Sequence, residues 1–419
     1  MKERVIMLVD GLSFYASIEK AAHPEYRDKP VAVGDPARKS GIILAACPAA
    51  KSQGVTTAER VGEALAKCPE LVVIRPRMQT YISVSLFMTE IYESFTDQVE
   101  PYSVDEQFLD VTGSLSLFGG SADEIARQIQ ARVQLSTGIW TRVGIGPTKI
   151  LAKMATDNFA KKVPGGVYTL SKDNIESDLW PLPIHQMFMV ASRMTRHFAH
   201  MGLLTIGDIA RLDLGEFKRR MRYEMGKQSD IQAEYYWQTA NGIDPSPVIA
   251  GMRKQIKVIN NGRALRWGKY RTMEDIEPLM LELVIEVCRR ARRYGYMGRV
   301  ISVAAAETDG YRSSSFGRQV TLFRPTYLEH EVGAAAYSLF AKYWRRMPIT
   351  HLHITLTGLS ADDVYQLDLF EDREKLILRS KTIDQIKDRF GPASIVRASS
   401  LMETGQAYER AAQIGGHWA

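Results

Sequence analysis

The chain has 419 residues, of which 45% are hydrophobic and 24% are charged, as is typical of a globular protein with room for two to four domains. Its formal net charge of +6 permits a polyanionic partner without identifying one. No apolar run approaches the roughly 20 residues of a membrane span, so we expect no membrane segment. The three cysteines are too few for a disulfide framework and lack the spacing of a zinc site. We therefore expect reduced, mostly packed thiols in a cytoplasmic protein.

Residues 1–167 alternate apolar runs with amphipathic segments, a pattern that predicts strands and helices in an α/β arrangement. Residues 1–10 predict a buried strand, and residues 11–20 predict a helix with Phe14 on its packed side. Next we expect a small hairpin from 31–34 and 41–46 and a short helix over 49–54. A capping box at Ser121–Glu124 predicts a helix that aligns Ile125, Ile129 and Val133. A strand is expected over 141–146, followed by a helix with Pro147 in its first position.

The second part of the chain predicts a helical segment and then a second α/β unit. Residues 168–241 are expected to be all-helical, and the polar stretch 242–247 to be a linker. One long apolar stripe predicts a helix, and it consists of Ile276, Leu279, Met280, Leu283, Val284, Val287, Cys288 and Ala291. The strands expected around that helix are 299–307, 315–322 and 349–358, and a tail of about sixty residues follows them.

Two adjacent carboxylates, Asp105 and Glu106, stand inside a strand-like stretch that runs from Tyr102 to Val111. Neighbours on a strand normally point to opposite faces, so adjacent acids at a strand end suggest a bend where both meet a hard cation. A second apolar run, residues 5–9, ends at Asp10. Three carboxylates in one unit cannot stay ionised and close together without cations, and oxygen ligands favour Mg²⁺. The alternative interpretation is a set of scattered surface acids.

Lysines are concentrated in the helix that is expected after residue 146 and just beyond it. Lys149 and Lys153 are four residues apart and share a face, and Lys161 and Lys162 follow them. These side chains could neutralise phosphates. The alternative is a solvated basic helix face, which is the commoner explanation of such a pattern.

Phe14 and Tyr15 follow Asp10 by four and five residues. Two aromatic residues in this position are most often part of a core. The alternative is that they form one wall of a nucleotide pocket beside the carboxylates. Lys51, in the short helix over 49–54, has the same two interpretations as the other lysines, a solvated charge or a phosphate contact.

Taken together, these motifs resemble the Y-family DNA polymerases, the translesion group. The family opens with a strand, an Asp and then Phe-Tyr/Phe-Ala-Ser-x-Glu, which here are Asp10 and residues 14–19. Its second signature, Ser-Ile/Val-Asp-Glu-x-x-Leu-Asp, matches residues 103–110. Its third signature matches Gly144–Lys153, then Ala160-Lys161 and Pro164-Gly165-Gly166. The resemblance covers nearly the whole chain. The sequence that begins at Gly144 is closer to that of the UmuC-like branch than to that of the DinB-like branch.

The resemblance implies a multidomain α/β (α+β) fold, a right-hand polymerase with palm, small fingers, helical thumb and an α/β little finger that binds DNA. The expected boundaries are 1–10 and 79–167 for the palm, 11–78 for the fingers, 168–241 for the thumb, 242–252 for a linker, 253–358 for the little finger and 359–419 for the tail.

The resemblance also implies roles for the site residues. Asp10, Asp105 and Glu106 resemble the catalytic carboxylates that bind two Mg²⁺ ions, and the Gly11 carbonyl is a further expected ligand. Tyr15 resembles the steric gate that packs under the sugar and rejects a 2′-hydroxyl, with Phe14 beside it in the nucleotide site. Lys161 resembles the lysine that contacts the triphosphate.

Two departures from the family pattern bear on nucleotide and DNA contacts. Many members carry Ser-x-x-Tyr-x-Ala-Arg in the fingers, where the Tyr and Arg hold the triphosphate, whereas this chain has Pro48 and Lys51 in that region. Lys51 keeps the charge but not the bidentate fork of Arg, and Pro48 supplies no hydroxyl. The usual Gly-x-Gly hairpin of the thumb is Val190-Ala191-Ser192 here, which weakens a backbone grip on phosphate.

The implied partners are primer-template DNA, a dNTP and replication or repair proteins, and no membrane. The expected backbone-phosphate contacts of the little finger are Arg263, Arg266, Lys269, Arg271, Arg312 and Arg318. In the tail, Gln366, Leu367, Leu369 and Phe370 resemble the motif that binds the bacterial sliding clamp, the β subunit of DNA polymerase III. The alternatives to a translesion polymerase are a non-catalytic adaptor in a mutagenesis complex, which would lose the acids, and a palm-type nucleotide cyclase.

Overall fold

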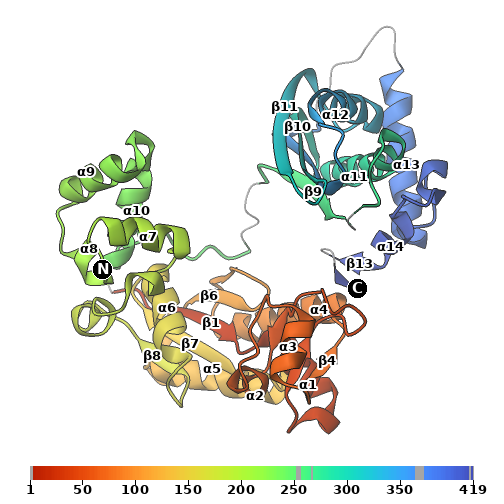
Figure 1. The fold of residues 1–419 in the computed structure, drawn as a ribbon. Helices are drawn as coiled ribbons and strands as arrows, with labels where there is room; N and C mark the ends of the chain where they lie inside the picture. The colour runs from red at the N-terminus through yellow and green to blue at the C-terminus, as the bar shows by residue number, and fades with distance from the viewer. Residues whose placement is uncertain (1–2, 252–255, 266–267, 364–371, 415–416, 419) are drawn as a thin grey trace. The chain divides into compact units, whose positions relative to one another are not determined.

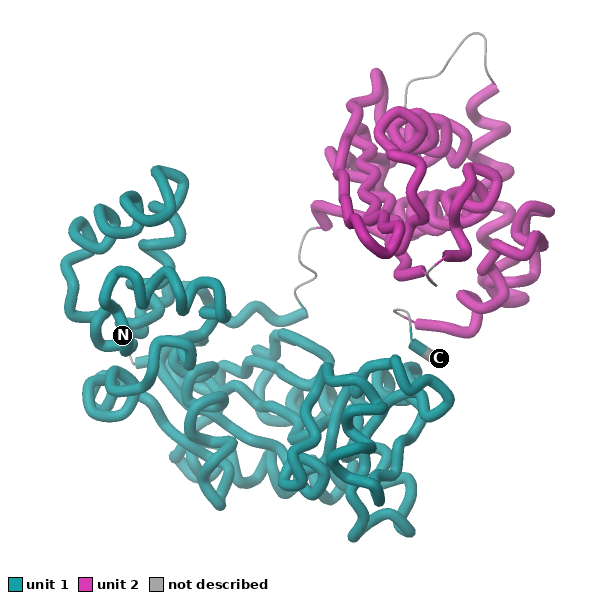
Figure 2. Tube along the Cα trace, viewed as in Figure 1, with its two compact units in different colours: residues 1–253, 417–419 teal, residues 254–416 magenta. Residues whose placement is uncertain are grey.

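The computed structural model describes residues 3–251, 256–265, 268–363, 372–414 and 417–418. The chain divides into two compact units, coloured separately in Figure 2. Unit 1 contains residues 1–253 and 417–419, and unit 2 contains residues 254–416. Each unit has a sheet and a hydrophobic core of its own.

A five-stranded sheet in the order β5-β6-β1-β7-β8 organises the first part of unit 1 (Figure 1). Its strands are β5 (Val99–Pro101), β6 (Glu106–Asp110), β1 (Ile6–Gly11), β7 (Thr141–Gly146) and β8 (Val167–Thr169). The central strand β1 is antiparallel to both of its neighbours. Every residue of β1 is buried, which explains why its sequence is a continuous apolar run and confirms the predicted buried strand.

Helix α6 (Lys149–Ala155) packs against β7 at unusually close range. A Cβ added at Gly144 would lie 2.2 Å from the carbonyl oxygen of Ala152, so only glycine allows the helix to approach this strand. A π-helical turn, η3 (Thr156–Ala160), continues α6. Pro147 does not occupy the first helical position as predicted, because Thr148 is the N-cap and its hydroxyl accepts a hydrogen bond from the Leu151 amide.

The other long helices of this part are α4 (Met78–Glu93) and α5 (Ala122–Thr137). On α5 the predicted apolar face is confirmed, because Ile125, Ile129 and Val133 are all fully buried. The expected capping box is present only in part, since the Ser121 hydroxyl accepts from the Glu124 amide while no reciprocal contact of the Glu124 side chain accompanies it.

A second, three-stranded sheet in the order β3-β2-β4 lies in residues 31–74. Strands β2 (Val31–Val33) and β3 (Ala45–Ala46) pair antiparallel and confirm the predicted hairpin, while β4 (Val72–Ile74) adds a parallel strand that was not predicted. The short elements around this sheet and its neighbour are α1 (Phe14–Ala22), η1 (Pro24–Tyr26), α2 (Pro48–Ser52), α3 (Val61–Lys67) and η2 (Leu115–Leu117).

Residues 171–241 form the helical part of unit 1 around a core that includes Phe198 and Phe217. Its elements are η4 (Ile175–Leu179), η5 (Ile184–Gln186), α7 (Ser192–His200), α8 (Ile206–Ala210), α9 (Leu214–Met225), η6 (Lys227–Ser229) and α10 (Asp230–Ala240). The prediction that helices start at 168 was wrong for the first two residues, because Tyr168 and Thr169 belong to β8 and pair with β7. Residues 242–247 form neither helix nor strand, as expected of the polar stretch.

Unit 2 contains a four-stranded sheet in the order β11-β10-β12-β9, with helices packed on one face (Figure 1). Its elements are β9 (Ile259–Ala264), α11 (Met273–Arg293), β10 (Tyr296–Thr308), β11 (Ser313–Thr326), α12 (Glu329–Tyr343), β12 (Ile349–Ala361), α13 (Arg373–Phe390), η7 (Ala398–Leu401), α14 (Ala407–Ala411) and β13 (Gln413–Ile414). The strand that follows in sequence, β14 (His417–Trp418), is assigned to unit 1. All residues of the predicted apolar stripe on α11 are buried. The three predicted strands are present, and each is longer than expected.

Helix α13 is joined to the rest of unit 2 by buried ion pairs. The guanidinium of Arg292 donates two hydrogen bonds to Asp384, at 2.6 and 3.1 Å, and its side chain is only 4% exposed. Arg373 forms a similar pair with Glu331, at 2.6 and 3.0 Å. Residues that the sequence suggested as a tail therefore contribute to the folded unit.

The cysteines and the helices of the described residues bear on two general expectations. Cys47, Cys68 and Cys288 are free and buried, which confirms the expectation of packed thiols. Among the described residues, no helix is long and apolar enough to cross a membrane.

Candidate active site

The register of the central strands brings two of the predicted acids face to face. Asp10, near the end of β1, pairs directly with Glu106, the first residue of β6. Paired residues of an antiparallel ladder project to the same side of the sheet. One carboxylate oxygen from each, together with one from Asp157, lies within 4.8 Å of the others.

Asp105 lies beside this group but outside it. Residues 103–105 form a bend before β6, as the adjacent acids suggested. The amide of Gly11 donates to the Asp105 carbonyl oxygen at 2.9 Å, which ties the bend to the end of β1. The Asp105 carboxylate accepts from the Ser103 hydroxyl at 2.6 Å. Its charge is felt by Tyr15, whose pKa is raised by burial and secondly by Asp105.

Two lysines neutralise the carboxylates. Lys161 Nζ lies 2.8 Å from an Asp10 oxygen, and Lys153 Nζ lies 2.6 Å from a Glu106 oxygen. Burial raises the pKa of Asp10 to about 7, although the charge of Lys161 acts in the opposite direction. Burial lowers the pKa of Lys161, but the attraction of Asp10 and Asp157 outweighs burial and leaves that pKa raised.

Asp157 is a member of the site that the sequence motifs did not single out. Its two oxygens are shared between the lysines, with Lys153 Nζ at 3.0 Å and Lys161 Nζ at 2.8 Å. Because of these lysines, the pKa of Asp157 is lowered in spite of its burial. A signal was present in the sequence, because the three residues are spaced by four and so share one side of a helix. The π-helical turn η3 that carries Asp157 is of a kind often found at functional sites.

The donor set fits divalent metal ions. Its side chains offer carboxylate oxygens, which are the ligands that hard cations prefer. The ammonium groups of Lys153 and Lys161 already bind Glu106 and Asp10, which shows that these positions attract positive charge. Burial raises the pKa of Asp10, so a cation bound beside it would favour its ionised form.

The residues predicted for the nucleotide surround the loop that follows β1. Phe14 is buried in the core, whereas Tyr15 is half-buried and stacks on Tyr81 with ring centroids 4.4 Å apart. Lys51 Nζ donates to the Ser13 hydroxyl at 3.0 Å and so reaches this loop from α2. Ser13 itself has a positive φ of 49°, which turns the chain sharply from β1 into α1.

Lys149 is not a solvated charge of a basic helix face. Its ammonium lies 2.5 Å from the carboxylate of Glu100, and only 13% of its side chain is exposed. Glu100 also accepts from the amide of Ile249 at 3.0 Å. Together with the pairing of Lys153, this arrangement rules out the solvated-face interpretation for the first two lysines.

The arginines and lysines predicted to contact DNA in unit 2 have very different surroundings. Arg263 donates to Gln406, Glu409 and Gln413, all within unit 2, and its side chain is 17% exposed. Lys269 donates to the carbonyl of Glu403. Arg271, Arg312 and Arg318 are exposed, and the Arg318 guanidinium lies over the ring of Tyr343 at 5.0 Å. Arg266 lies outside the described residues. As DNA contacts, all of them stay predictions.

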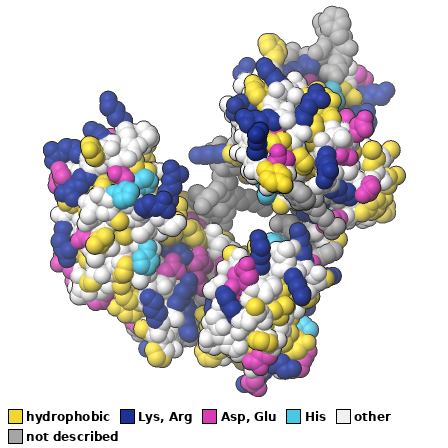
Figure 3. Space-filling view, in the orientation of Figure 1, with side chains coloured by type: hydrophobic (Ala, Val, Ile, Leu, Met, Phe, Trp, Pro, Cys, Tyr) yellow, Lys and Arg dark blue, Asp and Glu magenta, His cyan; other side chains and the backbone are white. Residues whose placement is uncertain are grey.

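Strand register explains why Arg263 and Arg318 meet protein groups. Arg263 pairs with Leu352, and Arg318 pairs with Val303, and both of these partners are buried on the helix side of the sheet. The other face presents mostly small or uncharged side chains, among them Ser302, Ala304, Ala306, Ser315, Gly317, Gln319, Thr355 and Thr357, together with the imidazoles of His351 and His353. Figure 3 shows Lys and Arg side chains on the visible face of each unit, mixed with acidic, apolar and uncharged ones.

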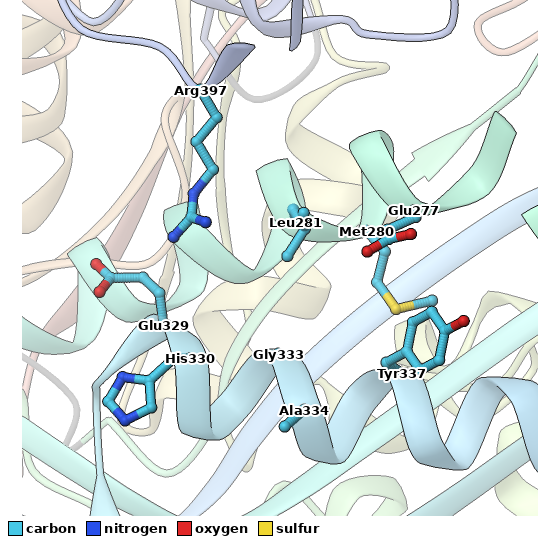
Figure 4. A pocket seen from close by; sticks show the side chains of 9 residues that line it. All are labelled: Glu277, Met280, Leu281, Glu329, His330, Gly333, Ala334, Tyr337 and Arg397. Atoms are coloured by element: carbon cyan, nitrogen blue, oxygen red, sulfur yellow. The ribbon is translucent and has the colours of Figure 1, made fainter. Parts of the chain in front are cut away.

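A separate cavity of about 340 Å³ lies in unit 2, between α11 and α12 (Figure 4). Side chains of Met280, Glu329, Tyr337 and Arg397 are among those that line it. None of the predicted carboxylate or nucleotide-binding residues contributes to this cavity, so it is distinct from the candidate active site. The segment with Gln366, Leu367, Leu369 and Phe370 lies outside the described residues.

Comparisons with known proteins identify the family that the chain resembles. The impB/mucB/samB family matches residues 9–157, and the C-terminal domain of the same family matches residues 260–369. DNA polymerase IV 2 of Bacillus subtilis is 48% identical over the full length of both chains. DNA polymerase IV 2 of Halalkalibacterium halodurans is 45% identical over 99% of this chain and all of the relative. DNA polymerase IV of Pelotomaculum thermopropionicum is 38% identical over 97% of each chain.

A solved structure supports the fold independently. A Y-family DNA polymerase chimera superposes with a TM-score of 0.69 at 21% identity, covering 85% of this chain and 99% of its own. The right-hand fold of palm, fingers, thumb and little finger is thereby confirmed. The closer resemblance to the UmuC-like branch stays a prediction. With a family match at both ends of the chain and relatives of up to 48% identity over its whole length, the chain belongs to the impB/mucB/samB family, the Y-family of DNA polymerases.

Proposed function

We propose that the chain is a template-directed DNA polymerase of the translesion type. The observation that carries this function is the pairing of Asp10 with Glu106 at the ends of two adjacent strands, each next to a lysine ammonium. The reaction joins the primer 3′-hydroxyl to the α-phosphate of a dNTP and releases pyrophosphate. We infer that it takes place in the cytoplasm, where bacterial DNA is found.

Asp10, Asp105 and Glu106 would hold two Mg²⁺ ions, with the Gly11 carbonyl as a further ligand. When bound, such ions stabilise the attacking and leaving oxygens of an in-line phosphoryl displacement. Asp105 lies on the bend next to Glu106, and its carboxylate would have to leave the Ser103 hydroxyl to join Asp10 and Glu106.

Lys161 and Lys153 supply positive charge for the triphosphate. In the structure they neutralise Asp10 and Glu106. Once those carboxylates hold cations, the ammonium groups are free to contact phosphate oxygens. Asp157 keeps a salt bridge to each lysine and so limits how far each can move. We therefore assign Asp157 the role of orienting both lysines.

We propose Tyr15 as the residue that selects the sugar. It is half-buried, it follows the β1 loop, and its charge environment includes Asp105. Phe14 supports the same loop from the core, and Lys51 approaches it from the fingers through Ser13. The single ammonium of Lys51 replaces a bidentate guanidinium, so we expect it to bind the triphosphate as a point charge.

A primer-extension assay tests the proposed function. The purified protein, a labelled primer annealed to a longer template, Mg²⁺ and all four dNTPs are expected to yield extended primers. Omission of the template should remove all extension, since the bases are selected by pairing. Absence of extension under these conditions would favour a non-catalytic adaptor. Such an adaptor would have no need of the three acids that this chain keeps.

We also propose that the segment 366–370 binds the sliding clamp. Its pattern, Gln-Leu-x-Leu-Phe, offers two apolar anchors and a polar side chain, and a few such anchors can dominate an interface. Tethering at the primer end raises the local concentration of an enzyme with low processivity.

Changing Leu369 and Phe370 to alanine together is expected to remove clamp-stimulated synthesis and to leave clamp-independent synthesis within about twofold of wild type. Synthesis on primed circular DNA with and without the clamp measures both quantities. Asp368→Ala in the same segment serves as the control, because the pattern assigns that position no anchor. Full stimulation of the double variant would contradict the proposal.

A further inference from the structure

The first sequence signature ends in Glu19, a residue for which the reaction has no obvious use. Glu19 lies on α1 and is completely buried, at 0% exposure. A buried carboxylate is costly unless it is paired and hydrogen-bonded. Glu19 is both, because Arg77 donates to its two oxygens, at 3.1 Å from Nε and 2.8 Å from Nη2. The hydroxyl of Tyr81 donates to the same carboxylate at 2.7 Å.

Tyr81 connects this buried carboxylate with the nucleotide site. Its ring is fully buried and stacks on the ring of Tyr15, with centroids 4.4 Å apart and planes inclined by 21°. Burial, followed by the hydrogen bond to Glu19, raises the pKa of Tyr81, so its hydroxyl stays protonated and remains a donor. One face of the Tyr15 ring is thereby backed by a ring that cannot swing aside without breaking a hydrogen bond to a buried charge.

The two helices involved are matched in spacing. Tyr15 and Glu19 are four residues apart on α1, and Tyr81 is four residues after Arg77, the residue that caps α4. Residues at this spacing lie on one side of a helix. The ring stack of Tyr15 on Tyr81 and the contacts of Glu19 therefore join α1 to the start of α4 at two points one helical turn apart on α1. While both contacts persist, α1 can neither slide nor rotate against α4.

We propose that Glu19 is a positioning residue for sugar selection, acting through Tyr81 on Tyr15. The inference rests on the proposed function, in which Tyr15 excludes a 2′-hydroxyl. An aromatic ring can exclude one additional oxygen only if it cannot retreat. Glu19 and Arg77 hold Tyr81 behind the gate, and Tyr81 removes the space into which Tyr15 would otherwise withdraw.

The test compares insertion of dATP and rATP opposite the same template thymine. The discrimination is the ratio of kcat/KM for dATP to that for rATP. Tyr81→Phe keeps the backing ring and removes its bond to Glu19, and we expect it to lower the discrimination about tenfold while kcat/KM for dATP stays within about threefold. Glu19→Gln should act in the same direction. Tyr92→Phe is the control, because Tyr92 is buried on the same helix and its hydroxyl has no hydrogen-bond partner among the described residues.

A double-mutant cycle separates positioning from a general structural effect. If Glu19 and Tyr81 act through the gate, adding Tyr81→Phe to Tyr15→Ala should change the discrimination no further. Equal effects of Tyr81→Phe with and without the Tyr15 ring would overturn the proposal, as would wild-type discrimination in the single variant. A wild-type ratio in Tyr15→Ala would instead refute the gate itself and the inference with it. Thermal unfolding of each variant identifies any that fail to fold, and if Glu19→Gln is among them, Tyr81→Phe decides the outcome.

Discussion

Replacing Glu106 by alanine is expected to lower the rate of nucleotide insertion by about a thousandfold or more, because one of the two face-to-face carboxylates is lost. Asp10 would remain with Lys161, and Lys153 would keep only Asp157 as its acidic partner. Binding of primer-template is expected to stay near wild type, since contacts to backbone phosphates elsewhere supply the affinity. Single-turnover insertion of one dNTP and fluorescence anisotropy with labelled DNA measure the two quantities.

The same strand offers a matched control for that variant. Asp110 lies at the far end of β6, where its carboxylate accepts from the amide and hydroxyl of Thr112. Asp110→Asn is expected to insert nucleotides at close to the wild-type rate. Asp105→Ala should lose insertion as Glu106→Ala does. Insertion by either of these alanine variants within about tenfold of wild type would rule out the assignment of that acid.

Replacing Tyr15 by alanine is expected to reduce the preference for dATP over rATP by about a hundredfold or more. The ring stacks on Tyr81, and the charge of Asp105 acts on it, so its removal is expected to open the space that a 2′-oxygen needs. Steady-state kinetics with both nucleotides opposite one template base provide the measurement. Tyr15→Phe retains the ring and is expected to keep most of the preference. Should Tyr15→Ala discriminate as well as wild type, Tyr15 would be no more than an aromatic residue at the edge of the core.

The core elements could be predicted because their patterns are local. The run before Asp10 is apolar without interruption, and the structure buries it in the middle of a sheet. The stripe on α11 repeats with the period of a helix, and every member of it is buried. The start of α6 could not be read correctly, because Pro147 and Thr148 are both common at helix starts and only the backbone decides between them.

The candidate site was predictable as a set of acids but not as a charge network. Asp10 and Glu106 are separated by nearly a hundred positions, and only the register of β1 against β6 places them opposite each other. Asp157 carries no signature by itself, because its role depends on Lys153 and Lys161. These lysines also bind acids on β6 and β1. The same limit applies to Arg263, whose side of the strand depends on pairing with Leu352.

The attachment of α13 has a consequence for any protein that takes up the segment before it. Strand β12 ends at Ala361, and α13, which begins at Arg373, is fixed by the Glu331 pair at its start and by the Asp384 pair further along. A partner bound between these points would therefore be attached to unit 2 on both sides of its binding segment. Two attachments restrict swivelling, so such a partner would control the direction in which unit 2 faces as well as its distance.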